Sequence, residues 1–178
     1  MSSNRPLVSW YALKVFYNKV FEIENYLREE GKESYIPLEE VVTWVRGVKK
    51  IQRKPVISSL VFFRSTEAYA RELQTTLKDR VLVYTDRTDD KRRPVAIPDR
   101  EMNLFMLVAS SGDKGLEYFC EDQKTWHTGE HVRVIEGIFK GAEGYIRRIG
   151  GNRRLVVSIQ GVCAVATSYI PSCFLEKI

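Results

Sequence analysis

The sequence predicts an α+β protein in two parts, a sheet covered by helices followed by a small all-β barrel. Over residues 1–113, strand-like and helix-like periods follow one another in the order β-α-β-β-α-β-α. This order is typical of the split βαβ, or ferredoxin-like, arrangement with a mostly antiparallel sheet. Over residues 126–178, short alternating runs are separated by glycine-rich turns, which is typical of a small closed barrel.

The first elements are a strand over residues 9–16, where aromatic and β-branched residues dominate, and a helix over residues 19–30. Apolar residues recur at helical spacing in the second segment, which predicts one buried face. Asn18 stands at the expected N-cap of this helix, and Gly31 stands where a C-terminal cap belongs.

Residues 33–64 predict a long hairpin with a basic tip. Its first strand covers residues 33–44 and is interrupted at Pro37, and its second strand covers residues 56–63. The basic residues between them, in a segment without any acidic residue, are Arg46, Lys49, Lys50, Arg53 and Lys54. A charge run of this kind is in most proteins a solvated loop, so the pattern alone assigns it no partner.

The N-terminal part is completed by two helices and a strand. Ser65 or Thr66 caps the second helix, residues 80–85 form a strand, and Asp99 caps the third helix. Residues 114–125 break the periodicity and predict an interdomain linker.

The C-terminal part begins with an alternating strand near residues 130–135, followed by glycines and by alternating runs at residues 155–159 and 162–166. Each glycine costs a helix about 1 kcal/mol, and Pro171 costs it about 3 kcal/mol. We therefore expect strands here and not a helical hairpin.

Composition excludes several classes. The 178-residue chain carries a net charge of +5, a mild indication of a polyanionic partner. No apolar run approaches 18 residues and the N-terminus has no apolar region, so we expect neither a membrane span nor a signal peptide. Three cysteines without C-x-x-C spacing argue against disulfides and favour a reducing cytosol.

No constellation of side chains predicts an enzyme. His127 and His131 have no cysteine or paired carboxylate at ligand spacing, which argues against a metal site. The adjacent pairs Glu39–Glu40 and Asp89–Asp90 are read as solvated charge, and no nucleotide, metalloprotease or hydrolase motif occurs. We expect no catalytic residue, no cofactor and no metal.

The C-terminal residues carry a family resemblance. The pattern Gly129-Glu130-x-Val132-Arg133-Val134-x-x-Gly137-x-Phe139 is similar to a KOW motif, in the form found at the C-terminus of NusG-type transcription factors. Leu155-x-Val157-Ser158-Ile159-x-Gly161 continues the match, and Phe174-Leu175-Glu176 closes it. A KOW motif alone also occurs in ribosomal proteins.

The N-terminal half resembles the same family. Trp10-Tyr11-Ala12-Leu13 is similar to the start of the NusG N-terminal (NGN) domain, and Pro94-Val95-Ala96-Ile97-Pro98 resembles the lead into its last helix. Ser58–Ser59 depart from the common Pro-Gly, and Leu60 from the common tyrosine. Within the family the chain resembles the RfaH-like and UpxY-like antiterminators, which act on surface-polysaccharide operons.

The resemblance implies a binding protein: an NGN domain over residues 1–113, a linker over 114–125 and an SH3-like KOW barrel over 126–178. In the family the NGN domain docks on the clamp helices of RNA polymerase and suppresses pausing or termination. The docking positions carried over to this chain are Tyr11, Leu60, Phe62 and Tyr84. Aromatic residues on a strand fit a core equally well, and this alternative stays open.

The resemblance also implies that the protein contacts nucleic acid and a second protein. It is expected to be a monomer and to bind no membrane. The basic tip is expected to contact phosphates of upstream DNA, with Lys14 and Lys19 as candidates for the non-template strand. Ile138 and Phe139 are the candidate contacts of the KOW barrel to a termination factor or a ribosomal protein, with barrel packing as the alternative.

A second function class remains open, that of a ribosome-associated or general RNA-binding KOW protein. Such a protein would use the barrel as an RNA platform. The phosphate contacts would then be Arg147, Arg148, Arg153 and Arg154.

Overall fold

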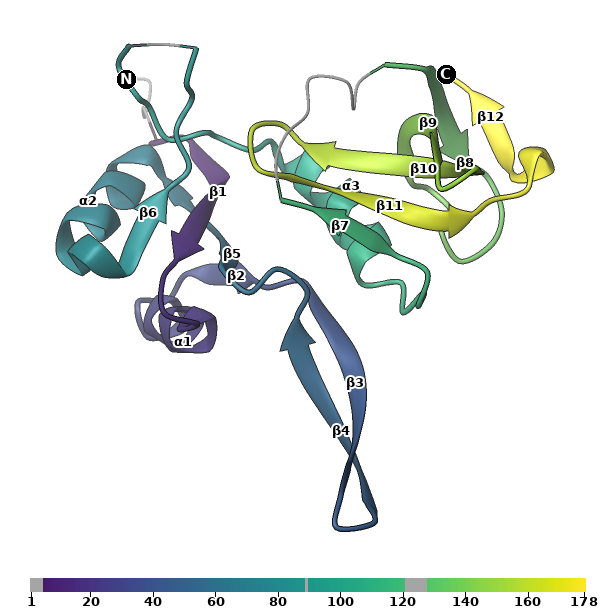
Figure 1. Ribbon diagram of the computed structural model, residues 1–178. Coiled ribbons are helices and arrows are strands. Elements are labelled where there is room, and N and C mark those ends of the chain that lie inside the picture. Colours follow the sequence, from purple (N-terminus) through teal and green to yellow (C-terminus); the bar gives the residue numbers. More distant parts are fainter. Residues whose placement is uncertain (1–4, 89, 121–127) are drawn as a thin grey trace. The chain divides into compact units, whose positions relative to one another are not determined.

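A computed structural model of the chain describes residues 5–88, 90–120 and 128–178 (Figure 1). The chain forms two compact units. The first consists of Met1–Ile36 and Ser58–Asp99, and the second of Pro37–Ile57 and Arg100–Ile178.

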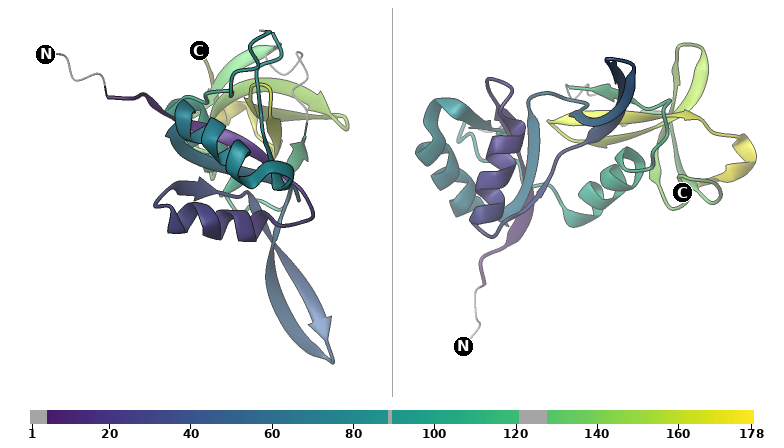
Figure 2. Two further views of the ribbon diagram at one scale, coloured as in Figure 1. Left: turned by 90° about the vertical axis from the view of Figure 1, so that its left-hand side faces the viewer. Right: turned by 90° about the horizontal axis from the view of Figure 1, so that it is seen from below.

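The first unit contains a four-stranded antiparallel sheet in the order β2-β5-β1-β6. Helices α1 and α2 lie side by side against one face of this sheet (Figure 2). The bounds are β1 Val8–Val15, α1 Val20–Glu29, β2 Glu33–Tyr35, β5 Leu60–Thr66, α2 Glu67–Leu77, a 3-10 helix Lys78–Arg80 and β6 Val81–Val83. This is the α+β arrangement predicted for the N-terminal part, and the prediction is confirmed.

The helix-covered face of the sheet holds an aromatic core. The ring of Tyr11 on β1 lies 5.7 Å from the ring of Phe63 on β5, which lies 6.0 Å from the ring of Tyr69 on α2. Apolar residues of both helices close this layer, because Ile23 and Leu73 are buried.

Two of the predicted caps are confirmed and one is wrong. Gly31 ends α1 with a φ of 70°, and the Thr66 hydroxyl accepts a hydrogen bond of 3.2 Å from the backbone N–H of Tyr69. Asn18 does not cap α1, whose N-cap is Lys19. Asn18 instead has a φ of 55°, a left-handed turn conformation that asparagine tolerates.

The third helix starts where the sequence placed its beginning. Asp99 is the first residue of α3, one position inside the helix from the cap that the sequence predicted. An acidic side chain in the first turn is favoured there by the helix dipole.

The Tyr69 hydroxyl is buried without a hydrogen-bond partner among the described residues. The substitution Tyr69→Phe is therefore expected to leave the free energy of unfolding unchanged or to raise it by up to about 1 kcal/mol. Tyr69→Ala, the control, removes the ring packed on Phe63 and is expected to lower it by about 3 kcal/mol. Urea denaturation measures both, and a loss above about 1 kcal/mol for Tyr69→Phe would contradict the assignment.

The wild-type protein and the Tyr69→Phe variant are also expected to differ in how their stability depends on pH. Burial raises the pKa of Tyr69 to about 12, so the unfolded chain releases this proton at a lower pH than the folded chain does. Stability therefore falls as pH rises from about 10 to about 12, and the phenylalanine variant is expected to lack this part of the loss.

The second unit contains the predicted hairpin, formed by β3 Leu38–Val45 and β4 Val48–Pro55. Its two-residue turn has φ values of 51° at Arg46 and 77° at Gly47. Positive φ at both positions defines the type I′ turn, whose twist matches that of the two strands. A hairpin in this region is confirmed, but its strands differ from the prediction: the basic segment expected as the tip forms most of β4, and the strand expected over residues 56–63 is β5 of the four-stranded sheet.

The remainder of the second unit is helix α3 and a six-stranded antiparallel sheet in the order β12-β8-β9-β10-β11-β7. Its buried residues include Val132, Val134, Leu155 and Ile159, as the alternation predicted. The bounds are α3 Asp99–Ala109, β7 Glu117–Phe119, β8 Glu130–Val134, β9 Glu143–Ile149, β10 Asn152–Ile159, β11 Cys163–Tyr169, a 3-10 helix Ser172–Phe174 and β12 Leu175–Lys177. The all-β C-terminal domain is confirmed.

Part of the segment expected as a linker is a strand of this sheet. Strand β7 pairs with β11, and Phe119 packs against buried Val156, Ala164 and Ala166. The other end of the expected linker, together with Trp126 and His127, lies outside the described residues.

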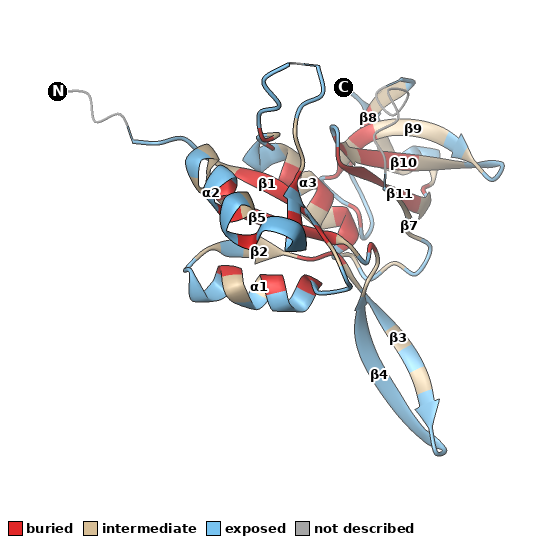
Figure 3. Cartoon of the chain, turned by 60° about the vertical axis from the view of Figure 1, so that its left-hand side comes forward, coloured by how far each residue is buried: buried red, intermediate tan, exposed pale blue. Residues whose placement is uncertain are grey.

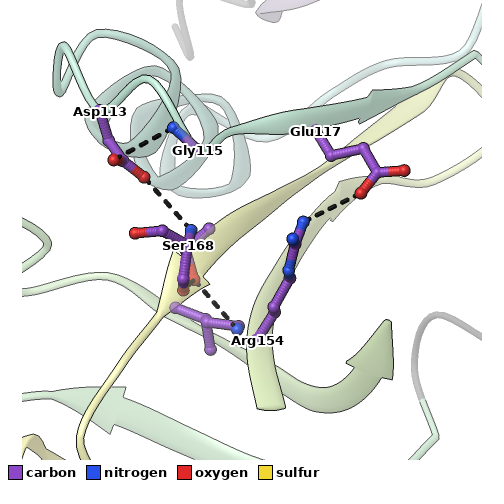
Figure 4. A network of polar contacts seen from close by, with 7 residues as sticks. Asp113, Gly115, Glu117, Arg154 and Ser168 are labelled. Atoms are coloured by element: carbon purple, nitrogen blue, oxygen red, sulfur yellow. Dashed lines mark hydrogen bonds and ion pairs between the residues drawn. The ribbon is translucent and has the colours of Figure 1, made fainter. Parts of the chain in front are cut away.

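The residues that lead into β7 are also held to this sheet. The Asp113 carboxylate accepts hydrogen bonds of 3.2 Å from the backbone N–H groups of Gly115 and Ser168, and Arg154 pairs with Glu117 at 2.9 Å (Figure 4). Strand β7 is too short to produce a period in the sequence, which is why it escaped prediction.

Candidate functional site

The β3–β4 hairpin carries the cluster of basic residues that the sequence analysis singled out. Figure 3 shows it mostly exposed, and all five predicted basic residues, from Arg46 to Lys54, are exposed. Across residues 38–55 there are five basic and two acidic side chains. Arg53 approaches Glu40 only to 3.9 Å, and both side chains are largely exposed, so this pairing leaves the hairpin positive.

The register of the hairpin separates two faces. On one face Trp44 lies opposite Lys49, Val42 opposite Ile51, and Glu40 opposite Arg53. On the other face Thr43 lies opposite Lys50 and Glu39 opposite Lys54. Residues directly opposite each other in an antiparallel pair share a face, so we name these the Trp44 face and the Lys50 face.

Trp44 is the residue that sequence reasoning missed. Its side chain is 69% exposed, although tryptophan usually packs into a core or an interface. The sequence contained a signal for the position of Trp44, because every second residue of a strand points to the same face. Its use required the knowledge that no other strand pairs with this hairpin, and the three-dimensional structure supplies this for the described residues.

The two weaker DNA candidates lie in the other unit. Lys14 is an exposed residue of β1, with its ammonium nitrogen 5.9 Å from the ring centre of Phe16. Lys19 forms an exposed ion pair of 3.4 Å with Glu22. Both lysines therefore belong to a different compact unit from the hairpin.

The candidate docking residues fall on two faces of the N-terminal sheet. Phe62 lies opposite Ala12 in the register of β5 and β1, and the backbone N–H of Tyr84 donates to the Ala12 carbonyl at 3.0 Å. Phe62, Ala12 and Tyr84 therefore form a row on the face opposite α1 and α2, and Leu60 lies two residues along it. Tyr11 points to the helix-covered face, so the structure does not bring it together with the other three.

Burial divides this docking row. Phe62 is 0% and Leu60 1% exposed, while Tyr84 is half-buried. Tyr35 on β2 lies opposite Phe62, with the ring centres 6.4 Å apart, and is also half-buried. The sequence did not single out Tyr35, which extends the aromatic row toward the edge of the sheet.

An ion pair fixes the entrance to α3 on the same face. The Arg64 guanidinium donates two hydrogen bonds of 3.0 Å to the Asp99 carboxylate. The hydrogen bond from Arg64 holds the pKa of the Asp99 carboxyl below its usual range.

The two candidate partner contacts of the C-terminal domain both lie in the loop between β8 and β9, and they differ in exposure. Ile138 is 65% exposed, whereas Phe139 is 4% exposed, and this burial fits the packing alternative that the sequence left open. A shallow apolar cavity of about 170 Å³ lies beside Ile138, lined also by Tyr169, Pro171 and Phe174. Gly137 has a φ of 84°, a conformation that favours glycine, and a Cβ at this position would lie in tight contact, 3.2 Å, with the Phe174 ring.

The four arginines of the alternative RNA platform lie on β9 and β10, where Arg147 is opposite Arg154 and Arg148 opposite Arg153. Three of them have intramolecular partners. Arg154 pairs with Glu117, Arg153 approaches Glu130 at 3.7 Å, and Arg147 donates to Thr128. The two carboxylates partly offset the charges of Arg153 and Arg154, whereas neutral Thr128 does not offset that of Arg147, so the arrangement favours the hairpin as the anion-binding surface.

Helix α3 is tied to the C-terminal sheet by a shared carboxylate. Glu143 on β9 accepts from Arg133 at 2.8 Å and pairs with Arg100 of α3. The hydrogen bond from Arg133 lowers the pKa of Glu143. Glu143 is therefore engaged in structure, and we assign it no chemistry.

Among the described residues, no group of three or more histidines, cysteines, aspartates and glutamates could hold a metal ion. His131 instead stacks on Tyr145, with the ring centres 4.7 Å apart. Within the same residues no helix is long and apolar enough to cross a membrane.

A family model described as "Transcription termination factor nusG" matches residues 8–106. The chain belongs to the NusG family. Its members are non-enzymatic transcription factors, which agrees with the expectation from sequence that this protein is not an enzyme.

The chain is also similar to one protein of known function and to one solved structure. The transcription termination/antitermination protein NusG of Campylobacter jejuni is 23% identical over 167 residues, which cover 85% of this chain and 88% of the relative. A solved structure, titled "Domain interaction in Thermotoga maritima NusG", is 18% identical, covers 97% of this chain and 98% of its own, and has a TM-score of 0.48.

Proposed function

We propose that this NusG-family protein binds RNA polymerase through its N-terminal domain and suppresses pausing or termination during elongation. The observation that carries the proposal is the family match over residues 8–106, which spans the whole four-stranded sheet with its docking row. A helix of the polymerase clamp laid against that row would gain its affinity from partly open aromatic anchors, Tyr84 and Tyr35.

The basic hairpin supplies the second contact in this proposal. Its five exposed cations would bind phosphates of upstream or non-template DNA without reading sequence. Lys14, exposed on the same sheet face as Leu60, and Lys19 are further candidates for phosphate contacts with the non-template strand.

We also infer a division of labour along the chain, with residues 1–113 contacting polymerase and residues 126–178 recruiting a second protein. In support, the C-terminal sheet presents exposed Ile138 beside an apolar cavity. The partner is a termination factor or a ribosomal protein. Residues 114–125 connect the two parts and contribute β7 to the second.

A finer proposal is that the protein is a specialised antiterminator of the RfaH-like or UpxY-like kind, serving surface-polysaccharide operons. It is supported by the departures from the common family pattern at Ser58, Ser59 and Leu60. A gene position at the head of a capsule or exopolysaccharide operon is the expected finding. A position beside genes for ribosomal proteins would contradict it.

The test of the main proposal is capture of partners by the purified full-length protein. We expect it to retain RNA polymerase and not ribosomal RNA. Tyr84→Ala is expected to lower affinity for the elongation complex by about ten- to a hundred-fold, the usual range for an aromatic anchor. The control Phe21→Ala removes an exposed ring from α1, on the opposite side of the sheet, and is expected to change nothing.

A second variant guards against a folding artefact. Lys14→Glu alters an exposed position on the docking face and is expected to weaken polymerase binding without changing the unfolding midpoint. Retention of ribosomal RNA in place of polymerase would favour the alternative RNA-binding function. Full polymerase binding by both variants would exclude this face as the contact.

A further inference from the structure

We propose that the Trp44 face of the hairpin is a base-stacking platform for single-stranded DNA. This inference rests on the proposed function, which brings the hairpin to DNA during transcription. It goes further because it names an unpaired strand as the ligand and assigns a role to an aromatic residue instead of to charge alone.

Three of the five large exposed apolar side chains of the hairpin, including its one aromatic ring, lie on the Trp44 face, while Val45 and Val48 lie at the tip of the Lys50 face. Trp44 is 69%, Ile51 61% and Val42 46% exposed, and the register places the three together. Holding an indole and two aliphatic side chains in water is unfavourable, at about 25 cal/mol for each Å² of apolar surface. A contiguous exposed group of this kind marks a contact surface.

The charges around Trp44 identify the chemistry of the ligand. Lys49 lies directly opposite Trp44, and Arg46 occupies the adjacent turn. Residues 44–54 contain no acidic side chain. An aromatic plane flanked by cations binds the two parts of a nucleotide at once, because the base stacks on the ring while the phosphate pairs with the cations.

The ligand is an unpaired strand and not a duplex, because the bases of a duplex are already stacked on one another. A duplex offers the hairpin only its phosphates, and the Lys50 face is suited to this. There Thr43 and Val41 are half-buried, while Lys50 and Lys54 are exposed. The two faces therefore predict different contacts: base stacking together with phosphate contacts from Lys49 and Arg46 on the Trp44 face, and phosphate binding alone on the Lys50 face.

The test measures binding of the full-length protein to a fluorescent oligothymidine of about 12 nucleotides, a length within the usual site sizes of single-strand binders, over a range of salt concentrations. Trp44→Ala is expected to weaken binding by about five- to a hundred-fold, because one stacked base contributes about 1–3 kcal/mol. The slope of log K against log salt is expected to stay unchanged, and Trp44→Phe is expected to retain most of the affinity.

Two controls separate stacking from other causes. Val48→Ala removes an exposed apolar side chain at the tip of the Lys50 face and is expected to have no effect. Lys50→Gln combined with Lys54→Gln is expected to reduce the salt slope for matched duplex DNA by about 1.8, as two lost phosphate contacts require. Matched duplex DNA and oligouridine are measured beside the oligothymidine.

Three results would overturn the inference. Unchanged affinity in Trp44→Ala would exclude stacking. An equal loss of affinity for duplex DNA in Trp44→Ala would show that the Trp44 face binds phosphates and not bases. Tighter binding of oligouridine than of oligothymidine would identify RNA as the ligand. The polymerase capture described above is independent of Trp44. If it succeeds while the stacking test fails, the proposed function stands and only this inference is lost.

Discussion

Replacement of all five basic hairpin residues by glutamine is expected to lower affinity for the elongation complex by more than about a hundred-fold near about 100 mM salt. Each phosphate contact contributes about 0.7–0.9 to the slope of log K against log salt. Five such contacts give a slope near about 4, so the wild-type protein is expected to lose roughly several hundred-fold affinity between about 50 and 200 mM salt. The variant is expected to lose little.

The control for this variant removes the same charge elsewhere. Glutamine replacements at five exposed basic positions of the first unit keep the net charge equal to that of the hairpin variant. These positions are Arg28, Arg71, Lys78, Arg80 and Arg87. They are expected to leave the salt slope close to the wild-type value. Equal slopes for the hairpin variant and the wild-type protein would remove the hairpin from the DNA contact.

The substitution Gly144→Val is expected to have the largest effect on folding. A Cβ at this position would lie 2.2 Å from the carbonyl oxygen of Val156 and 3.1 Å from its carbonyl carbon. These are backbone atoms of the paired strand β10, which cannot move aside without breaking the ladder between β9 and β10. We expect a loss of at least about 4 kcal/mol, at the upper end of single substitutions.

Denaturation followed by circular dichroism measures this loss. Gly150→Asn is the matched control, because Gly150 has a φ of 59° that asparagine tolerates, and a Cβ at this position would have no neighbouring atom within 4 Å. It is expected to change the free energy of unfolding by less than about 1 kcal/mol. A stable Gly144→Val protein would mean that β9 and β10 do not pair as described.

The caps and turns were predictable because each depends on residues next to one another in the chain. Thr66 caps α2 through a hydrogen bond three residues away, and Gly31 ends α1 with its own backbone conformation. Asn18 failed for a related reason. Asparagine is favoured both at helix caps and in left-handed turns. Asn18 belongs to the turn that precedes the helix, where Tyr17 also has a positive φ of 62°.

The site residues were less predictable. Tyr11 and Phe62 are both aromatic residues of predicted strands. The register places Tyr11 on the face of the sheet that α1 and α2 cover, and Phe62 on the opposite face. Ile138 and Phe139 are adjacent, yet one is exposed and the other buried. Alternation shows that neighbours point to opposite faces, and it does not show which face is covered.

The sequence by itself determined the α+β class, the positive charge of the hairpin, the β character of the C-terminal part and the resemblance to the NusG family. These follow from periodicity, glycine positions and local composition. The tertiary structure alone decided that β7 joins the C-terminal sheet, which aromatic residues share a face, and that Trp44 is exposed beside Lys49. Each of these depends on which distant segment pairs with or covers a strand, and neighbouring residues carry no record of that choice.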